Sequence, residues 1–326
     1  MKRKYLVAAC VAAMILGGCG SAETTENSIF DKEPITATAY AGQADGSEAG
    51  QTEDNGAGQN DASQADGATS ETGADACATE DYTEQIKSEI AAIAAGGNLS
   101  DELEMVSDLF DQYDDMRMDA ETQTEMNWKA QWGTQVWVSE VESLMERIEN
   151  CGNSSAIEQI KPAFKDWSSN VDAMAQKMSY SYEGGSIQGM IVLQNKGILY
   201  RNEAFALAST LADLNGDVAF TFPARDSYGF YGDFASGEYV ILTEGMESGS
   251  YSVLISTKDG GEITGYGFQA DGDAFGSTDG ELTFASDDDS VSGTLSYSAM
   301  GANLSVTEST NDAFPAGSSY EFSFHN

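Results

Sequence analysis

Residues 121–150, ETQTEMNWKAQWGTQVWVSEVESLMERIEN, form the longest uninterrupted helical pattern in the chain. Three of the four tryptophans lie in this stretch. Its apolar residues recur with the 3.6-residue period of an α-helix, so the sequence predicts one long helix with partners on its apolar side. The expected buried side comprises Trp132, Val136, Val141, Leu144, Met145 and Ile148.

The start of this helix carries its own signal. Thr122 and Glu125 stand three residues apart, which fits an N-cap hydroxyl followed by an acid that interacts with the helix dipole. A contact surface for a partner is the alternative interpretation of the same side chains. We adopt the cap as the prediction.

Segments on both sides share the helical period. Residues 81–95 predict a helix that ends at a Gly-Gly pair, and Ser100 is the expected N-cap of the next helix. Ser155 begins a capping-box pattern that opens a further helical segment, which Pro162 either restarts or kinks. The aromatic and methionine residues of these helices are expected to form a core rather than a cofactor site.

A glycine pair interrupts the pattern before the last helix, which is expected over residues 187–214. The Gly-Gly-Ser string at 184–186 is expected to break the chain and to cap that helix. Together these elements predict an all-α bundle over residues 79–214.

Two short strings in this bundle, and an aromatic helix of the Ala-Phe-x-x-Trp type at 163–167, resemble the LprI-like lysozyme-inhibitor domain. That family consists of small secreted helical domains that lipoproteins often carry. The resemblance covers about residues 80–214, and it implies a helical fold and a lysozyme-inhibitor-like function. The matching string residues are Thr122, Gln123, Glu125, Met126, Asn127, Gly184, Gly185 and Ser186.

The chain departs from that family at two positions. The family has one cysteine shortly after its Met-Asn pair and another after its Gly-Gly-Ser string, and these positions hold Lys129 and Asn195 here. The joint absence is consistent with the loss of one disulfide as a unit. It bears on the inhibitor function more than on the fold.

After residue 214 the apolar period changes to two. About nine short strands at even spacing, separated by turn signals and by no helix, predict an antiparallel meander that closes into a barrel over residues 215–326. An open β-sandwich is the alternative. The fold class is therefore α+β with two domains. The expected strands are 217–222, 230–234, 238–244, 250–257, 262–270, 280–285, 290–297, 302–307 and 319–324.

The opening of the β region, YGFYGDFASGEYVILTE at 228–244, resembles the lipocalin-like barrels that are often appended to lipoproteins of Gram-positive bacteria. This resemblance implies a barrel that either holds a small apolar ligand or is filled by its own side chains.

The charge balance excludes several classes of partner. The chain carries 15 basic and 54 acidic residues, for a formal net charge of −39. Nucleic-acid binding lacks its main electrostatic term because phosphate would be repelled, and a polybasic membrane-binding patch is equally disfavoured. Basic proteins, cationic peptides and divalent cations remain as partners. The simpler interpretation is that the charge only keeps an extracellular protein soluble.

The first residues have the pattern of a bacterial lipoprotein signal peptide. A basic segment at 2–4 precedes an apolar segment at 5–16 that is too short for a stable membrane span. Cys19 is the expected lipidation site, which predicts a lipid anchor on the outer side of the bacterial cell membrane. An ordinary signal peptide with an accidental cysteine is the alternative. The residues that resemble the lipobox are Leu16, Gly17 and Gly18.

Residues 20–78 are predicted to be a disordered acidic tether. Small and polar residues dominate this segment, so it cannot bury enough apolar surface to offset its ordering entropy. A flexible coil of this length would span roughly 40 Å. After signal removal and lipidation, two cysteines remain. Cys77 and Cys151 either form a disulfide or stay as free thiols.

No catalytic or metal-binding pattern stands on a rigid part of the sequence. The only histidine, His325, is next to the last residue of the chain. The segments that begin at Asp213 and Asp271 start like EF-hand loops but lack later ligands, so both are expected to be hairpin turns. The Asp-Asp-Asp run at 287–289 predicts a solvated turn. The sequence therefore predicts neither catalysis nor a cofactor.

These observations predict a non-catalytic, cell-surface binding module for an extracellular protein, such as lysozyme or another basic protein. A carrier that holds a small apolar ligand in the barrel is one alternative. A surface spacer without a specific ligand is the other.

Overall fold

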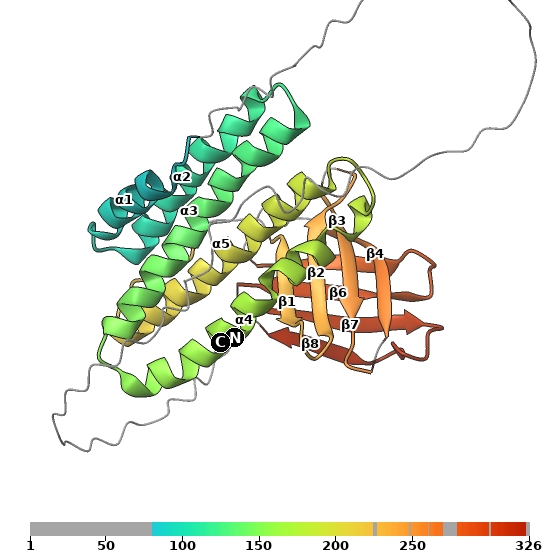
Figure 1. Cartoon of the computed structure of the whole chain (residues 1–326). Coiled ribbons are helices and arrows are strands. Elements are labelled where there is room, and N and C mark those ends of the chain that lie inside the picture. The colour runs from blue at the N-terminus through green and yellow to red at the C-terminus, as the bar shows by residue number, and fades with distance from the viewer. Residues whose placement is uncertain are drawn as a thin grey trace, which may run out of the picture. The chain divides into compact units, whose positions relative to one another are not determined.

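The computed structural model describes residues 80–223, 227–247, 249–259, 261–269, 279–299 and 301–323. In these residues helices come first and strands follow, which confirms the predicted α+β layout (Figure 1). The helices are α1 (Thr83–Ala94), α2 (Leu99–Asp114), α3 (Gln123–Asn150), α4 (Ser154–Met178) and α5 (Gln188–Asn215), with short 3-10 helices η2 (Asp115–Asp119) and η3 (Tyr180–Tyr182). The strands are β1 (Gly229–Asp233), β2 (Glu238–Glu244), β3 (Ser250–Ser256), β4 (Glu262–Gln269), β5 (Gly280–Ser286), β6 (Val291–Ser298), β7 (Gly301–Ser309) and β8 (Ser319–Ser323).

The long helix α3 is the centre of the helical part, where it contacts α1, α2 and α5. Every residue predicted for its core side is buried. Trp137 is 1% exposed, and its ring packs edge-on against Phe205 of α5 at a centroid distance of 5.9 Å. A buried aromatic of this size supplies much of the apolar contact that holds two helices together.

Helices α3 and α5 run side by side and in parallel (Figure 1). The Thr134 hydroxyl donates to the Leu193 carbonyl at 2.9 Å, and the Trp137–Phe205 contact follows further along both helices. Because the contacts advance in the same direction along both helices, their first turns lie at the same end of the pair.

Two helix starts differ from the sequence expectation. Asn98 caps α2 by accepting from the Ser100 amide at 3.0 Å, and Asn153 caps α4 by accepting from the Ala156 amide at 3.2 Å. The predicted caps Ser100 and Ser155 are therefore wrong, because an asparagine two residues earlier accepts the first-turn hydrogen bond in each helix. Helix α4 then continues through Pro162 without restarting.

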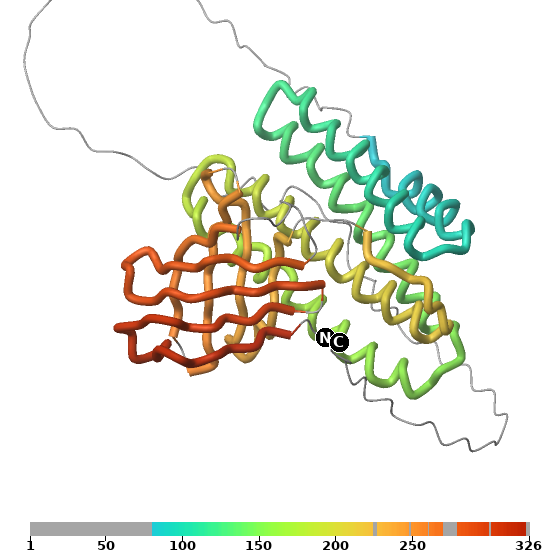
Figure 2. The backbone as a smooth tube through the Cα atoms, turned by 180° about the vertical axis from the view of Figure 1, so that it is seen from behind, coloured from blue at the N-terminus to red at the C-terminus, as the bar shows by residue number. Residues whose placement is uncertain are grey.

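The strands form one antiparallel sheet in chain order, β1 to β8, so each connection is a hairpin (Figure 2). Strand β1 also contacts β8, which nearly closes the sheet into a barrel and confirms the predicted barrel over the sandwich. A ligand inside this barrel would have to displace packed side chains. The interior is filled by buried residues that include Tyr231, Tyr251, Leu282, Phe284, Leu295, Tyr297, Leu304, Phe314 and Phe322.

Strand β2 is buried on both of its faces. Val240 and Leu242 belong to the barrel core, whereas Ile241 between them is also fully buried. Helix α4 contacts β1 and β2, and α5 contacts β1, so helices cover the outer face here. The run Val240–Leu242 is continuously apolar for this reason, while β6 alternates between buried and half-buried residues.

Residues 217–222 are not a strand, contrary to the prediction. The Thr221 amide donates to the Ser100 hydroxyl at 3.0 Å, and this hydroxyl donates back to the Thr221 carbonyl at 2.9 Å. The Phe222 ring stacks on Phe205 at 6.3 Å. A segment of alternating apolar residues forms a strand only where it can pair with a neighbouring strand. Here the backbone of Thr221 pairs with Ser100 at the start of α2 instead. The segment that begins at Asp213 is not a hairpin turn, contrary to the prediction. It contains the end of α5, where Gly216 has a φ of 70°.

Candidate functional site

The string Thr122–Asn127 at the start of α3, which resembles the LprI-like family, forms a helix cap as predicted. The Thr122 hydroxyl accepts from the Glu125 amide at 3.1 Å, and the Glu125 carboxylate accepts from the Glu121 amide at 2.9 Å. Lys129 lies 2.8 Å from the same carboxylate and, ahead of the Glu121 bond, lowers the pKa of Glu125. The amide of Gln123 donates to Asn127 at 2.9 Å, and Met126 is half-buried. These side chains therefore bond mainly to one another.

Thr122→Ala is expected to lower the free energy of unfolding by about 1 kcal/mol, because it removes one acceptor from the first turn of α3. Urea unfolding followed by tryptophan fluorescence measures this change. Thr124→Ala is the matched control, since Thr124 is exposed two residues away and has no such cap bond. Equal destabilisation by both variants would contradict the cap.

The Gly-Gly-Ser string at 184–186 lies before α5. Contrary to the prediction, none of its side chains caps that helix. Gly184 at φ 75° turns the chain, and its amide donates to the Gln188 side chain at 3.0 Å. Helix α5 begins at Gln188, and Ile187 is its N-cap residue without a side-chain bond. Gly185 and Ser186 are exposed. Because α3 and α5 are parallel, this string lies at the same end of the helix pair as Thr122.

The two positions that hold cysteine in the LprI-like family have other partners here. Lys129 forms the ion pair with Glu125. Asn195 is buried, and its amide donates to the Ser179 hydroxyl at 3.0 Å, which ties α5 to the end of α4. Both side chains thus serve local structure.

A row of acids follows the exposed side of α2 and ends at the first residue of η2. We call this row the acidic face. Its members are spaced three and four residues apart, so they share one side of the helix. All are exposed, and none forms an ion pair with a cation in the described part of the chain. Partial burial, and then the charges of Asp108, Asp115 and Asp114, raise the pKa of Asp111. The acidic face consists of Asp101, Glu104, Asp108, Asp111 and Asp115.

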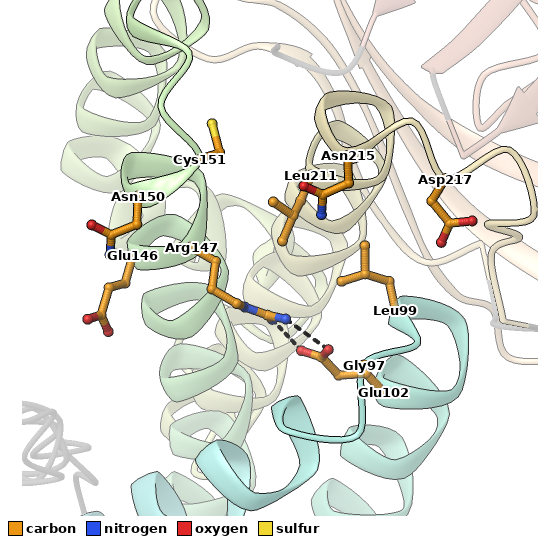
Figure 3. A pocket seen from close by; sticks show the side chains of 10 residues that line it. All are labelled: Gly97, Leu99, Glu102, Glu146, Arg147, Asn150, Cys151, Leu211, Asn215 and Asp217. Carbon is orange, nitrogen blue, oxygen red and sulfur yellow. Dashed lines mark hydrogen bonds and ion pairs between the residues drawn. The ribbon is translucent and has the colours of Figure 1, made fainter.

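An open recess of about 730 Å³, the end hollow, lies where α2 begins and α3 and α5 end (Figure 3). Arg147 reaches across it from α3 to Glu102 of α2, and its Nη1 donates to Glu102 Oε2 at 3.0 Å while Nη2 pairs with Oε1. Glu102 is 1% exposed. The guanidinium is therefore held by protein, and the remaining charged rim, Glu146 and Asp217, is acidic. Cys151 also lines the rim.

A second acid lies beneath this ion pair. Glu140 of α3 is 0% exposed, and its Oε1 lies 3.7 Å from Arg147 Nη2. Neither carboxyl oxygen has a hydrogen-bond partner within the described chain. Burial, and then the charge of Glu102, raise the pKa of Glu140 well above its usual range, which favours the neutral acid. Arg147 is thus the one cation near two buried carboxyls in the described residues.

A smaller recess of about 280 Å³, the side hollow, lies between α4 and α5. Ile160, Phe164 and Trp167 line it from α4, and Leu207 and Glu203 line it from α5. Glu203 is 6% exposed, and burial raises its pKa to about 8. The raised pKa favours the neutral form of this carboxyl at neutral pH.

These buried acids are not among the predicted site residues, although their spacing in the sequence carries a signal. Glu140 lies four residues from Val136 and from Leu144, and Glu203 lies four residues from Leu199 and from Leu207. An acid with apolar residues four positions before and four positions after it lies on the buried stripe of a helix.

Several predicted residues lie outside the described part of the chain: Leu16, Gly17, Gly18, Cys19, Cys77, His325 and the segment from Asp271. Cys151 is half-buried, and its pairing with Cys77 stays a prediction. The Asp-Asp-Asp run at 287–289 is a turn between β5 and β6, in which Asp288 accepts from the Ser290 amide at 3.0 Å. No described helix is long and apolar enough to span a membrane, and no described cluster of His, Cys, Asp or Glu could hold a metal ion.

The chain matches none of the protein-family models, curated proteins or solved structures with which it was compared. The LprI-like and lipocalin-like resemblances therefore stay predictions that rest on the residues named above.

Proposed function

We propose that the chain is a lipid-anchored extracellular binding module, without catalytic activity, that captures a basic protein such as a lysozyme on the acidic face of α2. The observation that carries this proposal is the row of five exposed carboxylates without a paired cation in the described residues. The Thr122 string is engaged in capping, so the partner contact is assigned to α2 instead.

The acidic face suits a cationic protein surface for two reasons. Its carboxylates repel one another, and a bound cation relieves this repulsion. Partial burial, followed by the charges of the neighbouring acids, raises the pKa of Asp111. Met105, which is 41% exposed beside the row, adds an apolar contact. Opposite charge on the two partners also speeds their encounter, especially at low salt.

The test uses the chain without its first 19 residues and a lysozyme as the probe. We expect saturable binding that weakens as salt is raised, and slower lysis of cell walls by the enzyme. In the triple variant Glu104→Gln/Asp108→Asn/Asp111→Asn, the association rate should fall roughly tenfold or more.

The control variant Glu281→Gln/Glu308→Gln/Glu321→Gln removes the same charge from exposed positions of the sheet. It should change the association rate less than about threefold. Equal losses in both triple variants would assign the effect to net charge alone. A complete lack of binding by the unmodified chain would refute the proposed function.

A further inference from the structure

The side hollow is lined mainly by apolar side chains, and its polar lining residues are Glu203, Gln159 and Thr210. Trp167 and Phe164 stack on each other at 5.7 Å on the α4 side, and Leu207 faces them from α5. Ala163 contributes only a methyl group to the α4 wall, which leaves the recess open. Its volume of about 280 Å³ equals the liquid volume of roughly nine waters, enough for a short alkyl chain.

Glu203 faces this slot without a partner in the described residues. No hydrogen bond or ion pair to its carboxyl is formed there, although the side chain is 6% exposed. Tyr200 of α5 is close enough to interact electrostatically with Glu203, and no cation affects the pKa of Glu203, which burial alone raises. Lys196 is already bound to Asp172 at 2.5 Å. The site therefore lacks the positive charge that a buried carboxylate requires.

We propose that the side hollow binds a primary alkylammonium ion, with the alkyl chain against Trp167, Phe164 and Leu207 and the ammonium group paired with Glu203. The apolar walls remove the alkyl chain from water, and the ammonium group supplies the donors and the charge that the carboxyl lacks. This site is separate from the acidic face and does not depend on the proposed partner.

Binding by this route releases a proton. The ammonium group is charged throughout the neutral range, whereas Glu203 must ionise to pair with it. Below about pH 8 the apparent affinity should therefore rise roughly tenfold for each pH unit, and above about pH 8 it should level off. A merely structural glutamate would show no such linkage.

Calorimetric titration of the chain without its first 19 residues tests this site, with hexylamine as the probe. We expect saturable binding that weakens at least about tenfold with hexanol, which has the same chain without the charge. Titrations in buffers of different ionisation enthalpy should show close to one proton released at about pH 6. An amide-capped lysine is titrated for comparison, since it carries the same ammonium group as a lysine side chain of a protein. Tighter binding of hexylamine than of this lysine assigns the site to free amines.

Two variants and one control complete the test. Glu203→Gln should weaken hexylamine binding at least about tenfold and abolish its pH dependence. Ala163→Leu fills the slot and should abolish binding while Glu203 stays in place. Glu158→Gln removes an exposed acid of α4 and should leave the affinity unchanged. Binding that is unaffected by Glu203→Gln, or equal for hexylamine and hexanol, would overturn the proposal, as would no binding of hexylamine at all.

Discussion

Arg147→Met is expected to lower the free energy of unfolding by about 3–5 kcal/mol, because it leaves two buried carboxyls without their cation. Glu102 is 1% exposed and Glu140 is 0% exposed. Arg147 alone pairs with either of them in the described residues, with two hydrogen bonds to Glu102 and a 3.7 Å approach to Glu140. Urea unfolding at neutral pH measures the loss.

The control for this prediction is an exposed ion pair. Lys161 lies 3.1 Å from Glu149, and both side chains are about one-third exposed. Lys161→Met should therefore change the free energy of unfolding by less than about 1 kcal/mol. In the double variant Arg147→Met/Glu102→Gln, part of the stability should return because one buried charge is gone. Similar losses for Arg147→Met and Lys161→Met would contradict the assigned role.

The second large effect is a dependence of stability on pH that Glu203 causes. Its pKa rises from 4.5 to about 8 on folding, so the folded state holds the proton more tightly than the unfolded chain. The stabilising contribution of the neutral acid is complete below about pH 4.5, and it is lost as the pH rises to about 8. At about 1.4 kcal/mol per pH unit, the loss across this interval is roughly 5 kcal/mol.

Glu203→Gln removes this titration. The amide itself needs hydrogen-bond partners in the slot and so can lower the stability at every pH by about 1–3 kcal/mol. The difference between variant and unmodified chain should nevertheless move by several kcal/mol in favour of the variant between about pH 5 and about pH 8. Glu140 titrates equally in both proteins and cancels from this comparison. A constant difference, such as Glu158→Gln should give, would refute the buried proton.

The elements of the fold were largely predictable because their patterns are local. A helical period of 3.6 residues and an alternation of two both report how a segment meets the core. The bounds of β2 agree with the expected 238–244, and the cap at Thr122 is formed as expected. The cap of α2 was misplaced because Asn98 and Ser100 are both good N-cap residues, and sequence alone does not choose between them.

Residues 217–222 show where local patterns fail. Val218, Phe220 and Phe222 alternate as a strand would, yet Val218 is fully exposed and Phe222 stacks on Phe205 of α5. Ser100, which lies 121 residues earlier in the chain, occupies the backbone groups of Thr221. A contact at that separation leaves no trace in the alternation of the segment itself.

The order of helices and strands follows from local sequence patterns, since amphipathic periods and turn residues act within a few positions of one another. Which of the many acids are buried or paired depends on contacts between elements that are distant in the sequence. Glu104 and Glu102 are two residues apart on α2, but the first is exposed on the acidic face and the second is buried against Arg147. Glu203 likewise owes its environment to Phe164 and Trp167 of another helix. Solvent exposure and charge partners depend on long-range packing, so the chemistry of an acid follows from its neighbours in space.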